Sequence, residues 1–339
     1  FYGSINYLKD DGITVASDYR RFTGRLKADY QINNWLRIGG NMNYSHYSMH
    51  AAKGGNGSST DSGNMFAFSR IAPIYPLYLR DANKQIMHHA ASGLDAYDYG
   101  DNTSSGLGLS RPFLGGSNAL SDNRINLDFA DGNTFNGVAT ADIRLMKDLT
   151  FRSVNSVYLK ESRGKETVNP WFGQYATDNG SVSVEHGRTW SYNYQQVLNW
   201  KPTFGSHEFD FMLGHEYYRM ISTTLSGNKS NMFDLKYDEL SGAAVTKSTN
   251  SGSSMYNTEG WFGRVNYSYA NKYFGEVSYR RDASSMFHPE NRWGNFWSLG
   301  GAWLISKEEW FDAPWVDELK FKASYGAQGN DNIGQFLYT

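Results

Sequence analysis

The chain has 339 residues and nearly balanced charges, with 32 Lys and Arg against 34 Asp and Glu, so its length permits a large core and its charge gives no general attraction to nucleic acid. Aromatic residues make up 16% of it, with 24 Tyr and 35 Gly, which favours strands and turns. No stretch approaches the roughly 18 consecutive apolar residues of a transmembrane helix, so a membrane protein of this composition would have to cross with strands.

The first predicted strand, residues 1–9, begins without an initiator Met, a basic n-region or an apolar signal core, so we expect a fragment or a processed chain. Residues 20–32 give the strongest local signal, because Phe22, Leu26 and Tyr30 alternate there with charged and polar residues. This period of two persists over a stretch longer than the usual globular strand of about five to six residues. It is close to the roughly 9–11 residues that cross a bilayer.

The same reading predicts about eleven strands in the whole chain. They lie near residues 1–9, 20–32, 35–48, 133–146, 149–161, 181–200, 206–221, 255–270, 273–282, 293–305 and 318–328. Two patterns are weaker than the others: residues 149–161 lose their alternation near Arg152, and residues 293–305 have large apolar residues on both faces.

The connections between these strands alternate in length. Tight turns are predicted at Asn33-Asn34, Lys147-Asp148, 201–205 and Asn271-Lys272, with a medium turn at 306–317 on the same side. Long connections are predicted near 49–132, 162–180, 222–254 and 283–292. Outer-membrane barrels have short periplasmic turns and long extracellular loops. The regular alternation of short and long connections therefore predicts that residues 1–339 are part of one barrel domain.

Alternation alone also fits a half-buried sheet of a soluble sandwich. Two features favour the membrane. Full charges at successive positions of the polar face suit a wet lumen, and aromatic residues such as Trp190, Tyr192 and Tyr194 gather near strand ends, as an interfacial girdle requires. The predicted fold class is therefore all-β, a transmembrane antiparallel β-barrel.

Four short motifs follow one another along the chain. They are Tyr7-Leu8-Lys9-Asp10-Asp11-Gly12-Ile13, Pro73-Ile74-Tyr75-Pro76, Tyr279-Arg280-Arg281-Asp282-Ala283-Ser284-Ser285 with Asn291-Arg292-Trp293-Gly294-Asn295-Phe296-Trp297-Ser298, and Ser324-Tyr325-Gly326 leading to Gly329-Asn330-Asp331-Asn332-Ile333-Gly334. With them the chain resembles TonB-dependent transporters and, within these, the SusC/RagA-like branch. It departs at Ala283, where that family usually has Gly, which suggests a turn that tolerates a Cβ.

The resemblance implies about half of a barrel of roughly 22 strands, with the plug domain and TonB box not in this chain. It implies a multi-pass barrel in the lipid of a bacterial outer membrane that imports oligosaccharides, with peptides as the alternative. The implied partners are a SusD-like surface lipoprotein and TonB, which acts through the plug. Two other classes stay open: a passive pore or surface-adhesion barrel, and a soluble carbohydrate-binding β-sandwich.

The sequence predicts no enzyme, no cofactor and no metal site. Its lack of Cys excludes disulfides and thiolate ligands, and the neighbours His88-His89 have no third ligand at a suitable spacing. The run 53–59 lacks the Gly-Lys-Ser/Thr end of a phosphate-binding loop. Paired acids at Asp10-Asp11 and Glu308-Glu309 lie in connections, where they are usually solvated, and no nucleophile stands beside a base.

Substrate contacts are expected in the long loops, because aromatic and amide side chains can stack on sugar rings and donate hydrogen bonds. The candidates are Tyr97, Tyr99, Arg111, Asn169, Trp171, Gln174 and Tyr175. The same residue types also pack loops against one another, so a structural role is the competing reading for each of them.

Overall fold

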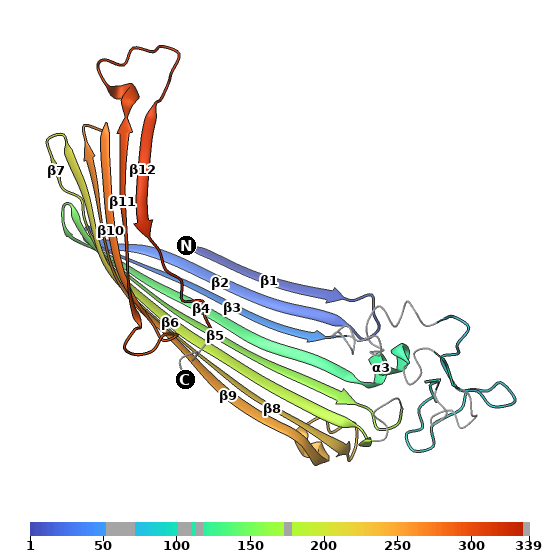
Figure 1. Ribbon diagram of the computed structural model, residues 1–339. Helices are drawn as coiled ribbons and strands as arrows, with labels where there is room; N and C mark the ends of the chain where they lie inside the picture. Colours follow the sequence, from blue (N-terminus) through green and yellow to red (C-terminus); the bar gives the residue numbers. More distant parts are fainter. Residues whose placement is uncertain (52–71, 101–109, 113–117, 173–177, 335–339) are drawn as a thin grey trace.

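One antiparallel sheet makes up most of the molecule. The computed structural model describes residues 1–51, 72–100, 110–112, 118–172 and 178–334. In these ranges twelve strands form a single sheet in which each strand, apart from the short β7, pairs with its neighbours along the chain (Figure 1). None of the helices in the described ranges is long and apolar enough to cross a membrane.

The strands are β1 (Tyr2–Asp11), β2 (Asp18–Asn33), β3 (Leu36–His50), β4 (Leu127–Met146), β5 (Leu149–Val168), β6 (Ser181–Trp200), β7 (Thr203–Phe204), β8 (His207–Met232), β9 (Ala243–Tyr269), β10 (Tyr273–Ser284), β11 (Trp293–Leu304) and β12 (Lys320–Ala327). The helical segments are α3 (Ala119–Ile125), η2 (Leu240–Gly242) and η3 (Ile305–Lys307). Every predicted strand is present, including the two with weak patterns, and β7 is an addition inside the predicted 201–205 turn.

Several strands run further than the sequence predicted. The loop prediction for 222–254 is wrong over most of its length, because β8 continues to Met232 and β9 begins at Ala243. Likewise β5 enters the predicted 162–180 loop and β4 begins inside the predicted 49–132 loop. In the added parts of β5, β8 and β9 most residues on both faces are polar, so the alternation that marks the middle of each strand is lost there.

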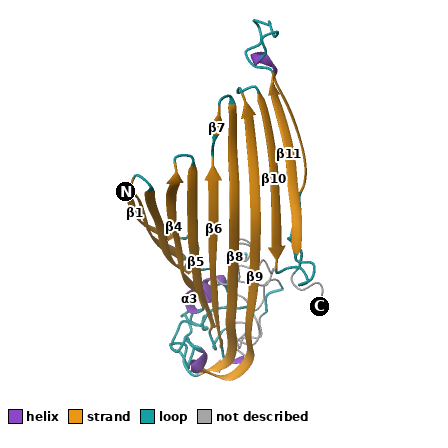
Figure 2. Cartoon of the chain, turned by 90° about the vertical axis from the view of Figure 1, so that its left-hand side faces the viewer, coloured by secondary structure: helices purple, strands orange, loops and turns teal. Residues whose placement is uncertain are grey.

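The tight turns gather at one end of the sheet and the longer connections at the other (Figures 1 and 2). Asn33 closes the β2–β3 turn by accepting hydrogen bonds from the backbone N–H groups of Trp35 and Leu36, at 3.0 and 2.9 Å. The β9–β10 turn centres on Ala270 and Asn271. Their φ angles of 51° and 54° are left-handed, as a type I′ turn requires at its two central residues. We refer below to the turn end and the loop end of the sheet.

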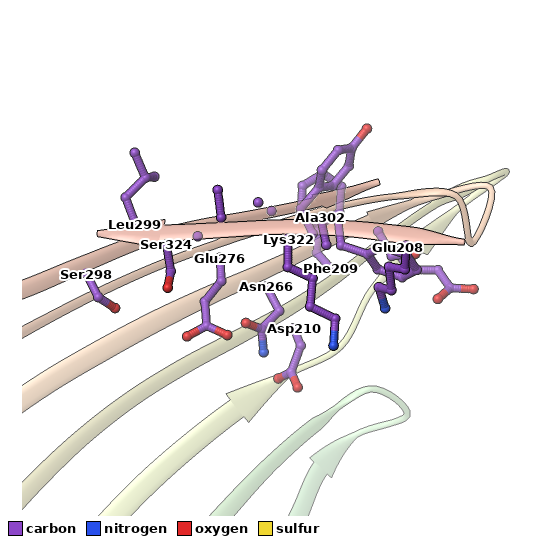
Figure 3. A pocket seen from close by; sticks show the side chains of 18 of the residues that line it. Glu208, Phe209, Asp210, Asn266, Glu276, Ser298, Leu299, Ala302, Lys322 and Ser324 are labelled. Atoms are coloured by element: carbon purple, nitrogen blue, oxygen red, sulfur yellow. The ribbon is translucent and has the colours of Figure 1, made fainter. Parts of the chain in front are cut away.

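The two faces of the sheet differ in chemistry. Asp210, Asn266 and Glu276 are register partners on the concave face, and Val265, Val277 and Leu299 are register partners on the convex face. Figure 3 shows Leu299 on the opposite side of the sheet from Glu276 and Asn266. The side chains of Val277 and Leu299 are 52% and 57% exposed, as expected of a surface that lipid covers.

Aromatic residues border this apolar convex band at both ends. Tyr273 stacks on Trp303 near the turn end, with ring centroids 6.4 Å apart, and Tyr192 stacks on Tyr217 toward the loop end at 5.8 Å. Further members are Trp200, Tyr267 and Tyr269 near the turn end, and Tyr194, Trp261, Tyr279 and Trp297 toward the loop end. An apolar band between two aromatic girdles is the surface of a transmembrane barrel, so the predicted fold class is confirmed.

Candidate functional site

A charged network lies on the concave face between β8 and β10. The Arg280 guanidinium donates to Asp282 at 2.7 Å and to Glu216 at 3.2 Å, and it lies over the Phe262 ring at 5.1 Å. Gly260 makes room for it, because a Cβ there would come within 2.3 Å of the Asp282 carboxylate. The network therefore holds the Arg280 guanidinium between two carboxylates on the wall of the lumen.

A hollow of about 710 Å³ opens on the same face near the turn end (Figure 3). The buried oxygens Asp210 Oδ1, Asn266 Oδ1 and Ser268 Oγ have no hydrogen-bond partner among the described residues. Lys201 pairs with the other Asp210 oxygen at 3.0 Å, and Lys322 is also part of the lining. Beside apolar groups such as Phe274, the hollow thus presents acceptors, hydroxyls and cations that can pair with a polar solute.

A small hydrophobic cluster orders the loops at the loop end. Tyr99 is 1% exposed, and its ring stacks on Phe172 with centroids 6.1 Å apart. Tyr97 meets Phe172 edge to face at 5.9 Å, and Leu120 and Ile125 of α3 pack against the same rings. We call this group the loop cluster. It joins the 72–100 segment, α3 and the start of the 169–180 segment.

Hydrogen bonds fix α3 against the loop cluster. The Tyr99 hydroxyl lies within donating distance of Asp122 Oδ1, at 2.7 Å, and of Ser121 Oγ, at 2.8 Å. Asn118 caps the helix by accepting from the Ser121 N–H at 3.1 Å, while its amide donates to the Asp98 carbonyl. Burial raises the pKa of Tyr99, so the phenol stays protonated and remains a donor.

Three of the predicted contact residues, Tyr97, Tyr99 and Asn169, lie inside this assembly. Asn169 is fully buried; its side-chain amide donates to Asn126 Oδ1 at 2.8 Å, and its side-chain oxygen accepts from the Phe172 N–H at 2.8 Å. Their positions support the competing structural role, because buried groups that bind neighbouring loops offer little surface to a ligand.

The other predicted contact residues have different surroundings. Arg111 donates to the Asp98 carbonyl at 2.9 Å and lies over the Tyr75 ring at 5.3 Å. Trp171 is only partly buried, with one side against the loop cluster. Gln174 and Tyr175 lie outside the described residues. Contact with a substrate stays a prediction, and Trp171 is the candidate whose exposure best suits it.

The neighbours His88 and His89, which the sequence analysis did not assign to a metal site, make other contacts. His88 Nδ1 lies 3.2 Å from Asp95, and His89 Nδ1 lies 3.0 Å from Ser92 Oγ while its ring packs on Phe172. In the ranges that the structure describes, no three His, Asp or Glu side chains come together as a metal site would require.

The sequence analysis missed an ion cluster at the tip of the β8–β9 hairpin. Glu239 accepts from Arg163 at 2.7 Å and from Lys165 at 2.8 Å, and Lys165 also pairs with Asp238 at 3.2 Å. The hydrogen bonds from Lys165 and Arg163 hold the pKa of Glu239 below its usual range. No local signal could have revealed the pairing, because the partners are on β5 and on a connection far along the chain.

Replacing Glu239 with Gln should loosen the hairpin tip in a pH-dependent way. A carboxyl group whose pKa is lowered on folding stabilises the folded state above its unfolded pKa of about 4.3, and this contribution is lost as pH falls through the folded value. We expect amide exchange of residues 233–242 to be a few-fold faster in Glu239→Gln at pH 7, since exposed ion pairs contribute about 0.2–1 kcal/mol each. The difference should shrink as the pH is lowered from 7 to 3, because protonation of Glu239 removes its ion pairs. Glu290→Gln, in the β10–β11 loop, is the control and should change nothing at either pH.

Comparison with known proteins finds curated relatives and solved structures that are similar to this chain. No family model matches the chain. It is 26% identical to TonB-dependent receptor P3 of Formosa agariphila, over 99% of this chain and 32% of the relative. It is 27% identical to TonB-dependent receptor SusC of Bacteroides thetaiotaomicron, over 99% of this chain and 33% of that protein. The chain thus spans about a third of the length of these curated relatives.

Among solved structures, the RagAB peptide transporter matches with a TM-score of 0.75 and 21% identity, over 99% of this chain and 36% of that one. A curved antiparallel sheet with a polar concave face, an apolar convex band and aromatic girdles defines the wall of a membrane β-barrel. Together with the curated relatives, it confirms the predicted resemblance of the chain to SusC/RagA-like TonB-dependent receptors, and its fold is that of part of such a barrel. These relatives are named as receptors and transporters, not as enzymes.

Proposed function

We propose that the whole protein is an active importer of hydrophilic oligomers in a bacterial outer membrane, with this chain as part of its wall. The observation that carries the proposal is the concave face, where the Arg280 network and the hollow around Asp210 present charges and hydrogen-bonding groups to the lumen. A wall of this chemistry lets a hydrated solute exchange water for protein contacts. Energy would come from TonB through a plug domain encoded elsewhere in the protein.

The proposed cargo is an oligosaccharide, and a SusD-like surface lipoprotein is the proposed partner at the loop end. Hydroxyl, amide and carboxylate groups in the hollow can pair with sugar hydroxyls, and the partly exposed Trp171 can stack on a sugar ring. A peptide is the second candidate, because the same groups pair equally well with a peptide backbone and because a solved structure of the same fold is named a peptide transporter.

Uptake by whole cells tests the proposal. Cells with and without the gene would be given labelled oligosaccharides and labelled peptides of similar size, with and without an uncoupler that removes the energy for TonB. Energy-dependent uptake of either class supports active import and names the cargo. Uptake that persists with the uncoupler would instead indicate a passive pore.

Trp171→Ala should lower uptake at limiting cargo roughly twofold to twelvefold, because an aromatic stacking contact contributes about 0.5–1.5 kcal/mol. Trp171→Phe should retain most of the activity. The matched control is Trp315→Ala, since Trp315 is 86% exposed in the connection at the turn end and should not meet arriving cargo. Equal uptake by Trp171→Ala and the wild type would remove Trp171 from the set of contact residues.

A further inference from the structure

The outer part of β9 has one paired edge and one free edge. Its pairing with β8 continues from Tyr269 to Ala243, whereas its pairing with β10 ends at Thr258, opposite Ser284. Figure 2 shows the β8–β9 hairpin extending beyond the end of β10. Within the described part of the chain, no strand pairs with the far edge of residues 243–256. Residues 244–253 are all exposed.

The last backbone hydrogen bond between β9 and the β10 side of the sheet shows which residues of β9 turn their N–H and C=O groups toward the free edge. The Asn257 carbonyl accepts from the Ser285 N–H at 2.9 Å, so the main chain of Asn257 points toward that side. Successive residues of an antiparallel strand turn their N–H and C=O groups to alternate sides. Ser251, Ser253 and Met255 therefore present unpaired donors and acceptors along the free edge.

The hairpin is held firmly from its other side. Pairing of β8 with β6 reaches Ser230, opposite Ser181, and Val182, Met232 and Ala243 form a small buried core beneath the tip. The Glu239 ion cluster adds a second anchor at the tip. The free edge is thus presented in an extended conformation, which lowers the entropy cost of adding a strand to it.

The free edge has few of the features that usually prevent an edge strand from pairing with another chain. Residues 244–256 contain no Pro, and their one charge is Lys247, which pairs with Asp178 at 3.5 Å. One bulge lies near the tip, where the register with β8 shifts between Asn228 and Lys229. Most of the other side chains are Ser, Thr, Asn or Gly, so an edge of this kind recognises a partner through its main chain.

We propose that residues 249–255 of β9 are a β-augmentation site that accepts an extended strand of the surface lipoprotein; this rests on the partner named under the proposed function. Unpaired N–H and C=O groups at strand spacing complement a polypeptide strand and not a sugar. The edge also points along the wall rather than into the lumen, so it suits a protein that rests on the rim better than cargo inside the barrel.

Hydrogen–deuterium exchange on the full-length transporter, alone and in its purified complex with the lipoprotein, tests this site. Exchange of a peptide covering residues 249–257 should slow at least roughly tenfold in the complex. Protection of that peptide in the transporter alone would show that its own chain covers the edge, and the proposal would be wrong. Unchanged exchange in a complex that does form would also overturn it.

A pair of variants separates main-chain pairing from mere proximity. Ser251→Pro with Ser253→Pro removes two edge-facing donors, and Pro is tolerated where the N–H is not needed by the ladder. The Kd for the lipoprotein should rise roughly tenfold, while Ser251→Thr with Ser253→Thr should bind as the wild type does. Equal affinity of the Pro and Thr variants would overturn the site. Failure of the wild-type transporter to bind the lipoprotein would instead overturn the proposed partner.

Discussion

Replacing Leu299 with Lys should destabilise the folded barrel in lipid by about 2–4 kcal/mol, the range for a cation near the midplane of a barrel's lipid face. Leu299 lies in the convex band between Trp303, near the turn end, and Trp297, toward the loop end, and it is 57% exposed. The lysine head would have to leave water or distort the bilayer to reach it. Denaturant titration of the full-length protein in lipid vesicles measures the difference in the free energy of unfolding.

The control is Ser324→Lys on the concave face. Ser324 lines the hollow and is the register partner of Gly300, next to Leu299, and Lys320 and Lys322 already lie on the same strand. A lysine there stays in water, so we expect a change within about 0.5 kcal/mol. If the two variants were equally stable, the convex face would not contact lipid. The soluble β-sandwich would then be the better interpretation of the fold.

The contrast between these two positions explains how much of the fold the sequence could predict. Where one face meets lipid and the other meets water, side chains alternate, and the predicted strands 20–32 and 35–48 agree with β2 and β3 to within a few residues. The predicted strand 206–221 missed the continuation of β8 to Met232. Both faces of that part are polar, so the pattern that reveals a strand is absent although the backbone pairing is not.

The candidate site was harder to predict because its contacts depend on strand order and register. The resemblance pointed to the Arg280 region, but the bond from Arg280 to Glu216 joins β10 to β8 across the intervening β9. Nothing local to either residue specifies that alignment. The loop aromatics were predicted as ligand contacts from their chemistry alone, whereas the buried position of Tyr99 depends on α3, which the sequence analysis did not predict.

Replacing Tyr99 with Ala should disorganise the loop cluster while leaving the barrel folded. Truncating a buried aromatic side chain costs about 3–5 kcal/mol, and here it removes both the ring that stacks on Phe172 and the donor to Asp122 and Ser121. We expect faster amide exchange and earlier proteolysis in residues 78–99 and 118–126. The heat-dependent gel migration that reports a folded barrel should not change.

Two further variants identify which contact matters. Tyr99→Phe keeps the ring and loses the hydroxyl, so its cost should be about 0.5–1.5 kcal/mol and its exchange intermediate between Tyr99→Ala and the wild type. Tyr237→Ala, at a tyrosine that is 66% exposed, should have no effect. Wild-type exchange in Tyr99→Ala would mean that the rings do not hold the loops, and the case for direct substrate contact by Tyr97 and Tyr99 would then be restored. Wild-type order in Tyr99→Phe alone would assign the cluster's stability to ring packing, with the hydroxyl only orienting α3.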